Sequence, residues 1–527
     1  MRRRQCPLVS GLVAASLIAA ACSSADTGVT ARRAESSATT AVPSTVVADT
    51  ALPLPAPAEP ADTTAWPPAD SSPEPTDDTV RPAGNPDGVG DSLYPDLGNP
   101  GYDVTHYDVD VSYDTITTRL DAVVGIDLQP TEARAEFTLD ATFSGVTSVT
   151  VDGDVATFVE DPPELRISPP QPWLVGASVR VELVYSMSPD VLNGSDGIPV
   201  GWFDTEAGAY VLNEPDGART WLPSNDHPGD KATFRFVIHT PAGVTGVANG
   251  ELVEHTTNAA GDTWVWDNPD PTATYLLQVL IGDYEVIDTT GPNGLPLTSV
   301  VLRADRALMQ PYIDAIPAQI DFFDNYFGPY PLSRYGIAMT DSFGGLAMET
   351  TGRSLFSRED FLDGTVDYVQ DLLLSHELAH QWFGDAVSPA RWKDIWLNES
   401  FATYAQWMWL AKRGYATVDE QAADALAGRD RRATAEPTAQ DLFGFNSYEG
   451  GAVILHALRA TIGDQQFFEL LQTWVAKNSG TSRTTNEFIA LAEQVSAMDL
   501  TEFFDTWLFA TVTPQVFPVA VAVGVGA

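Results

Sequence analysis

Polar and apolar residues alternate with a period of two over much of the chain between residues 102 and 288. In the segment 106–114, acidic residues dominate one face, and the other face carries Tyr107, Val109, Val111 and Tyr113. The segments 179–185 and 234–239 repeat this pattern, and clusters of Gly, Pro and Asp separate such segments. This alternation is typical of strands with one buried face. We therefore expect residues 98–290 to form an antiparallel β domain.

Beyond about residue 310, the apolar residues recur instead with the period of a helix. This pattern predicts helices at residues 313–326, 366–383, 398–412, 452–462, 464–476 and 485–495. Residues 291–527 should therefore form a second, mainly helical domain. The fold class expected for the chain is α+β, with the β domain first.

The first 22 residues have the composition of an export signal. Three arginines at positions 2–4 precede an apolar stretch from Leu8 to Ala21, which is short for a membrane-spanning helix. Small residues just before Cys22 resemble a bacterial lipobox, so we expect export, lipid attachment at Cys22 and a location on the cell surface. Ala19 stands where a lipobox more usually has Leu, and secretion without a lipid remains the alternative.

Residues 23–97 are rich in Ala, Thr, Pro, Ser and Asp and poor in large apolar residues. Such a segment cannot bury enough surface to fold, and we expect a disordered tether. The only cysteines are Cys6 and Cys22, which excludes a disulfide framework and thiolate catalysis in the folded part. The net charge of −44 argues against nucleic acid as a partner.

A metal-ligand pattern lies within the second predicted helix. His376 and His380 are four residues apart and would lie on the same helix face, with Glu377 between them and Glu399 farther along the chain. Two imidazoles and one carboxylate form a catalytic zinc set that leaves one position open for water, and Glu377 suits a general base. The flanking residues are apolar, and two buried histidines without a ligand would be costly. We therefore expect one zinc ion bound by His376, His380 and Glu399.

The motif His376-Glu377-x-x-His380, with Glu399 inside Trp396-Leu-Asn-Glu-Ser-Phe-Ala, resembles the aminopeptidase N family of gluzincin zinc peptidases. The resemblance extends from Asn99 to about Pro518. It implies a saddle-shaped β domain, a thermolysin-like catalytic domain and removal of N-terminal residues from peptides that have a free amine. The chain would be a short bacterial form without the family's long helical C-terminal domain, and we expect a monomer.

Three further matches imply roles for single residues. The segment Gly345-Leu-Ala-Met-Glu-Thr resembles the family's exopeptidase motif, so Glu349 would bind the substrate's α-amine, together with Glu214 from a loop of the β domain. Tyr448 resembles the tyrosine that stabilises the oxyanion. Asp394 could orient a ligand histidine or cap a turn.

The chain departs from the family pattern at three positions. Leu346 and Thr350 differ from the exopeptidase motif and could change the pocket for the first residue, and Gly450 stands where the family often has a cation. The alternatives are an endopeptidase or an epoxide hydrolase on the same scaffold, or a surface binding protein without activity. Intact Glu349 and Glu214 argue against an endopeptidase.

Overall fold

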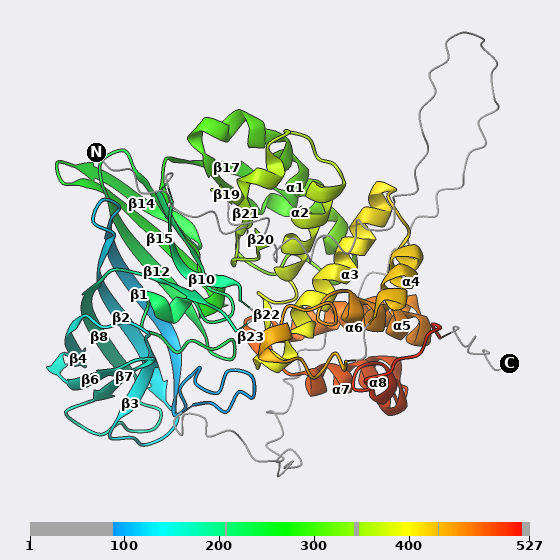
Figure 1. Cartoon of the computed structure of the whole chain (residues 1–527), viewed down its shortest axis with the longest axis horizontal. Helices are drawn as coiled ribbons and strands as arrows, with labels where there is room; N and C mark the ends of the chain where they lie inside the picture. Colours follow the sequence, from blue (N-terminus) through cyan, green and yellow to red (C-terminus); the bar gives the residue numbers. More distant parts are fainter. Residues whose placement is uncertain (1–87, 196, 206–207, 342–346, 430–431, 519–527) are drawn as a thin grey trace, which may run out of the picture. The chain divides into compact units, whose positions relative to one another are not determined.

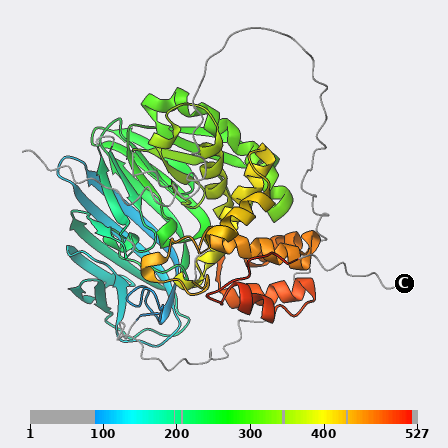
Figure 2. The ribbon, with the colours of Figure 1, turned by 45° about the vertical axis from the view of Figure 1, so that its right-hand side comes forward.

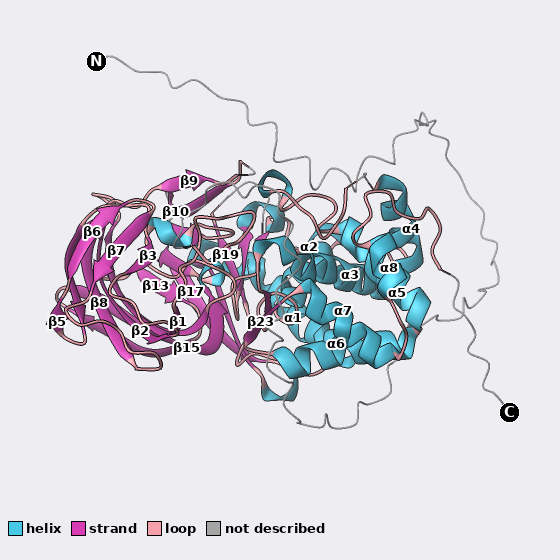
Figure 3. Ribbon diagram, turned by 90° about the horizontal axis from the view of Figure 1, so that it is seen from below, coloured by secondary structure: helices cyan, strands magenta, loops and turns pink. Residues whose placement is uncertain are grey.

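The computed structural model describes residues 88–195, 197–205, 208–341, 347–429 and 432–518. The predicted signal, Cys22 and most of the predicted tether lie outside these residues, as does Leu346. Figure 3 shows that the strands and the helices of the described chain are largely segregated. The expected α+β class, with the strands first, is confirmed.

The largest sheet has eight strands in the order β14-β15-β12-β1-β2-β8-β4-β5 (Figure 1). In β1, residues of alternating burial follow the predicted pattern, with Tyr107 and Val109 in the core. The strands are β1 (Tyr102–Asp114), β2 (Arg119–Pro130), β4 (Val146–Val151), β5 (Asp154–Val155), β8 (Val179–Met187), β12 (Lys231–Thr240), β14 (Glu251–Asn258) and β15 (Gly261–Ala273).

One strand pair in this sheet differs from the prediction of an antiparallel domain. β1 pairs with β12 in parallel, with Tyr107 opposite Phe234, whereas its other neighbour β2 is antiparallel. The two aromatic rings stack with their centroids 4.8 Å apart. Alternation along a strand predicts which face is buried and carries no information on the direction of the neighbouring strand.

Two smaller sheets complete the β domain. One has five strands in the order β13-β16-β11-β10-β9, and the other has the order β3-β7-β6. Their buried residues belong to the same hydrophobic core as those of the large sheet. The strands are β3 (Phe137–Asp140), β6 (Thr157–Asp161), β7 (Glu164–Ser168), β9 (Val191–Asn193), β10 (Pro199–Thr205), β11 (Gly208–Leu212), β13 (Thr245–Ala248) and β16 (Val279–Gly282).

A fourth sheet, in the order β17-β18-β19-β21-β20, precedes and accompanies the helices. Its strands are β17 (Tyr284–Thr290), β18 (Pro296–Leu302), β19 (Ile337–Thr340), β20 (Ala347–Met348) and β21 (Ser354–Ser357). The predicted domain boundary after residue 290 falls between β17 and β18, which pair with each other. The pairing therefore groups β17 with the chain that follows it.

Six helices overlap the predicted ones, although α1 begins at Arg306 rather than at residue 313, and α4 and α8 are additional. Figure 2 shows α5, α6 and α7 packed side by side. The short strands β22 (Val387–Pro389) and β23 (Thr481–Arg483) pair in parallel beside them. The helices are α1 (Arg306–Phe327), α2 (Tyr368–His380), α3 (Trp396–Arg413), α4 (Val418–Gly428), α5 (Glu449–Ile462), α6 (Asp464–Asn478), α7 (Thr485–Ser496) and α8 (Thr501–Trp507). Among the described residues, no helix combines the length and apolar character needed to cross a membrane.

The prediction of a disordered tether is wrong for residues 88–97. Tyr94 and Leu97 are buried, and the Tyr94 ring packs edge-on against Trp392 at 6.0 Å. Asp91 accepts hydrogen bonds from the backbone N–H groups of Tyr94 and Trp392 and pairs with His227 of the β domain. A few well-placed contacts therefore order a segment whose composition alone suggests disorder.

Candidate metal centre and active site

Helix α2 carries both predicted histidine ligands and the predicted base. The helix begins with a capping box in which the Asp367 carboxylate accepts from Val369 N–H, and Gln370 accepts from Asp367 N–H. Its last two turns are buried on every side, as the apolar flanks of the motif predict. His376, Glu377 and His380 are therefore held in the interior of the protein.

Helix α3 supplies Glu399 from its first turn. The two helices are joined by Asp371 of α2, which accepts hydrogen bonds from Trp409 Nε1 and Arg413 Nε of α3 at 2.9 and 2.7 Å. A third bond comes from the Tyr415 hydroxyl. These contacts fix the spacing between the two histidines and the carboxylate.

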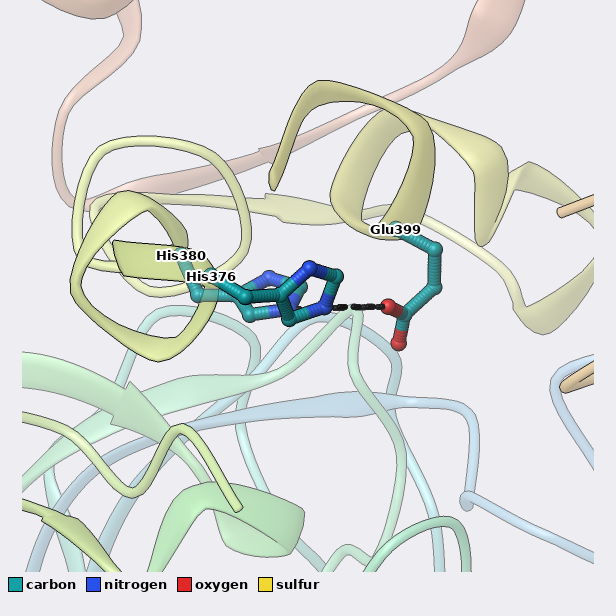
Figure 4. Close-up of side chains that lie close together, drawn as sticks. All are labelled: His376, His380 and Glu399. Carbon is teal, nitrogen blue, oxygen red and sulfur yellow. Dashed lines mark hydrogen bonds and ion pairs between the residues drawn. The ribbon is translucent and has the colours of Figure 1, made fainter. Parts of the chain in front are cut away.

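Figure 4 shows both imidazole rings directed towards the Glu399 carboxylate. Nε2 of His376 and Nε2 of His380 lie 3.3 and 3.5 Å from Glu399 Oε2, and one donor atom from each residue lies within 4.8 Å of the others. Two neutral nitrogen donors and one carboxylate oxygen, brought to a common point and buried, suit a zinc ion with one further position open. The residues present therefore fit the metal that the sequence predicts.

The other ring nitrogens of the two histidines are also engaged. Nδ1 of His376 lies 3.1 Å from Gln406 Oε1, and Nδ1 of His380 lies 3.1 Å from the carbonyl oxygen of Phe383. Because both partners are acceptors, Nδ1–H donates to them and each Nε2 keeps its lone pair for a metal. Gln406 lies seven residues after Glu399, two turns along the same helix face, which is a signal that the sequence contained.

The predicted role of Asp394 as a partner of a ligand histidine is wrong. Its Oδ1 accepts from the backbone N–H and the hydroxyl of Thr485, at 3.0 and 2.6 Å. Thr485 is the first residue of α7, so Asp394 satisfies free N–H and hydroxyl donors at the start of that helix. Gln406 and the Phe383 carbonyl occupy the place that Asp394 was expected to fill.

Negative charge accumulates around the metal site. Without a bound metal, burial alone would lower the pKa of His380, but the surrounding carboxylates raise it well above its usual value. In that state burial alone would raise the pKa of Glu399, but the positive charge of His380 and the hydrogen bonds from His376 and His380 lower it to about 2. Burial raises the pKa of Glu377 well above its usual range despite the nearby His380. A cation bound at this point would offset the cost of burying these carboxylates.

The two predicted amine-binding residues lie beside the metal ligands. Glu349 follows β20, Glu214 follows β11, and one carboxylate oxygen of each lies within 4.8 Å of a Glu399 oxygen. One ligand atom from each of Glu349, Glu377 and His380 also lies within 4.8 Å of the other two. The loop of Glu214 is fixed by Asn213, which donates to the Leu277 carbonyl and accepts from Trp221 Nε1.

Tyr448 is the residue just before α5, and its ring lies at a small angle of 20° to that of His376, with centroids 5.9 Å apart. Burial and the carboxylates of Glu399 and Glu214 raise the pKa of Tyr448 well above its usual value. The phenol is therefore protonated at neutral pH and can donate a hydrogen bond. Gly451, in the first turn of α5, allows that helix to lie close to α3, because an added Cβ would lie 1.7 Å from the Ser400 hydroxyl.

Two of the three departures from the family pattern lie in the described part of the chain. Thr350 is buried, and its hydroxyl accepts from Gln278 Nε2 and donates to the Arg353 carbonyl, so it faces the protein interior. Gly450 is also buried, and an added Cβ would lie 2.8 Å from Asn446 Oδ1. A long cationic side chain at position 450 would displace Asn446.

Comparisons with known proteins agree with this geometry. The sequence profile of the Peptidase family M1 domain matches residues 312–507, and that of the Peptidase M1 N-terminal domain matches residues 206–276. The chain belongs to the M1 family. The predicted membership of the aminopeptidase N group of gluzincins is thereby confirmed.

Relatives of this M1-family chain include aminopeptidases from bacteria and animals. Aminopeptidase N of Streptomyces lividans is 25% identical over 420 residues, which cover 73% of this chain and 48% of the relative. Human endoplasmic reticulum aminopeptidase 1 is 29% identical over 345 residues, covering 60% of this chain and 36% of the relative. The matched region thus spans about half or less of these curated relatives.

A solved structure of similar extent is also known. The M1 zinc metallopeptidase of Deinococcus radiodurans, as a mutant bound to a Tyr-Ser-Ala substrate, superposes with a TM-score of 0.74 and 28% identity. The superposition covers 82% of this chain and 99% of that one. A two-domain M1 zinc metallopeptidase mutant bound to L-tryptophan superposes with the same TM-score. The two-domain arrangement of this M1-family chain therefore has a solved counterpart.

Proposed function

We propose that the protein is a zinc-dependent aminopeptidase that removes the N-terminal residue from peptides. The observation that carries this proposal is the gathering of Glu349 and Glu214 beside the metal ligands. Two carboxylates at a fixed distance from the metal favour a ligand with a cationic end and a carbonyl group one residue away. The M1 relatives that carry the name aminopeptidase support the same activity.

His376, His380 and Glu399 would hold the zinc ion. When bound, zinc supplies a Lewis acid that makes water a nucleophile near neutral pH. Glu377 accepts the proton of the attacking water at its carboxylate and later gives it to the leaving amine.

Tyr448 and the two amine-binding carboxylates complete the mechanism. The Tyr448 hydroxyl donates a hydrogen bond to the oxygen that gains negative charge when the carbonyl is attacked. Glu349 and Glu214 accept hydrogen bonds from the substrate ammonium group and hold the first peptide bond in place. An acetylated N-terminus carries no positive charge and would leave both carboxylates without a cationic partner, which makes the site selective for free amines.

The test is hydrolysis of a panel of aminoacyl-anilides by the purified protein, each compound used free and N-acetylated. We expect cleavage of the free-amine forms alone, loss of cleavage with a chelator and recovery with zinc. Equal cleavage of the acetylated forms would instead indicate an endopeptidase. Absence of cleavage by protein with one bound zinc per chain would contradict the proposal and favour the epoxide hydrolase or the binding protein.

We also propose that the protein is exported, attached to the cell surface through a lipid on Cys22, and monomeric. The support for export and lipidation is the sequence of residues 1–22, which lie outside the described residues. Incorporation of labelled palmitate that is lost in Cys22→Ser would support lipid attachment, and release of unlabelled protein into the medium would contradict it. Sedimentation of the purified protein measures its oligomeric state.

A further inference from the structure

The turn that carries Glu349 is held by a glutamine next to a metal ligand. Gln381 directly follows His380 and is fully buried. Its Nε2 donates to the Glu349 carbonyl oxygen at 3.0 Å, and its Oε1 accepts from Gly352 N–H at 2.8 Å. One amide thus makes two bonds to the backbone of the turn 349–353, as a neighbouring strand would.

The opposite side of this turn is held by two amide side chains of the β domain. Gln278 Nε2 donates to the Thr350 hydroxyl and to the Arg353 carbonyl, each at 2.9 Å. Asn249 Nδ2 donates to the Thr351 carbonyl at 3.0 Å. These amides fix the turn relative to the β domain, whereas Gln381 fixes it relative to the helix that ends at His380.

We propose that Gln381 is the positioning residue that sets the distance between the amine-binding carboxylate and the metal site. The inference rests on the proposed aminopeptidase activity, in which that distance selects a free amine one residue from the carbonyl that is attacked. Gln381 bonds the backbone of Glu349 itself and is covalently adjacent to His380. A shift of the turn would therefore move the Glu349 carboxylate relative to the ligands, and a displacement of about 1 Å can cost about 100-fold in rate.

Gly352 shows that the turn is shaped for this contact. Its φ of +74° lies in the left-handed region, where a side chain is disfavoured, and this conformation points its N–H at Gln381. The Ser354 hydroxyl adds a bond from the following strand to the Glu377 carbonyl at 3.2 Å. The Gln381 amide is thus part of a continuous connection between the amine-binding turn and the metal-binding helix.

The test compares Gln381→Met with Gln370→Met in the full-length, zinc-loaded protein. Met has nearly the size of Gln and makes no comparable hydrogen bonds. Gln370 is a buried glutamine in the first turn of α2, the helix that Gln381 directly follows, and its side chain bonds the Asp360 carbonyl and the Asp367 N–H. It is therefore a matched control for loss of a buried amide at the other end of the helix.

The probes are L-leucine amide and N-acetyl-L-leucine amide, with binding measured by calorimetry, and KM and kcat measured with leucyl-anilide. In Gln381→Met we expect the preference for the free amine to fall by about 100-fold. KM for leucyl-anilide should rise, while one zinc per chain and the weak binding of the acetylated amide are unchanged. Gln370→Met should keep the wild-type preference.

An unchanged preference in folded, zinc-loaded Gln381→Met overturns the inference, and so does an equal loss in Gln370→Met. If Gln381→Met does not fold, Gln381→Asn keeps the amide but is one methylene too short to make both bonds, and it must lower the preference; an unchanged value then counts against the inference. Failure of the proposed function is separate, because it appears in the wild type as absent cleavage of leucyl-anilide. A wild type that binds both amides equally well overturns both proposals.

Discussion

Asp91 and Glu349 are buried to nearly the same degree, with 2% and 3% of their surfaces exposed, yet the fold treats them differently. Asp91 accepts from the backbone N–H groups of Leu93, Tyr94 and Trp392 and pairs with His227. Burial alone would raise the pKa of Asp91, but the hydrogen bond and charge of His227 and the N–H groups of Trp392 and Leu93 lower it. For Glu349, Oε1 has no partner among the described residues, and burial raises the pKa.

The difference separates a structural carboxylate from one kept for a ligand. Asp91 joins the N-terminal segment to both domains, and its hydrogen-bonding capacity is filled within the chain. Glu349 belongs to a group of buried carboxylates around His376 and His380, and burial raises the pKa of both Glu349 and Glu377. A buried acceptor left open is costly unless something from outside completes it, and here a metal ion and a substrate ammonium group would do so.

The largest expected effect concerns Glu377, one of the buried carboxylates around His376 and His380. Glu377→Gln should lower kcat by about 10³-fold, because the amide cannot accept the proton of the attacking water. Zinc content, measured by mass spectrometry, should stay at one ion per chain, because Glu377 is not among the proposed ligands. Activity close to the wild type would remove Glu377 from the mechanism and weaken the contrast with Asp91.

The next effect concerns the hydrogen-bond donor of the site. Tyr448→Phe should lower kcat by about 100-fold, with a smaller change in KM, because the phenol acts on charge that develops in the transition state. Tyr404→Phe is a control for loss of a buried tyrosine hydroxyl in the helical region, since that hydroxyl bonds Arg459. Equal losses in both variants would assign Tyr448 to packing.

A structural carboxylate should show its importance in stability alone. Asp91→Asn places an NH₂ group against N–H donors and should lower the free energy of unfolding by about 1–3 kcal/mol. Urea denaturation measures this change. The kcat of the folded variant should equal that of the wild type, and a large loss of kcat would show that the segment 88–97 also shapes the active site.

The sequence predicted six of the α-helices of the described chain, the β character of the segment before them and the residues that meet at the site, for identifiable reasons. The helical period from residue 313 onward and the spacing of His376 and His380 are local signals, and the structure reproduces both. The Asp91 contact was missed because its partner Trp392 N lies 301 residues away and the surrounding composition resembles a linker. For Asp394 the sequence left two roles open, a partner of a ligand histidine or a cap, since only the packing of α7 against the start of α3 decides which donor it meets.

The smallest effect, and the sharpest test of the comparison, is the pH dependence of stability in the metal-free protein. The pKa of Glu349 in the folded state is raised above its usual 4.5, so the folded state holds its proton longer, and Glu349 destabilises the fold as pH rises beyond 4.5. Glu349→Gln removes this cost and should raise the free energy of unfolding of the metal-free protein by about 1 kcal/mol at pH 7, with the gain fading towards pH 4.

The pKa of Asp91 is lowered below 3.8, so its contribution to the stability of the fold is present above pH 3.8 and is lost as pH falls through the folded-state pKa. The loss in Asp91→Asn should therefore be full at pH 7 and shrink only below pH 3.8. Urea unfolding across this range would thus give differences of opposite sign, whereas differences of the same sign would show that the two carboxylates are held in equivalent ways.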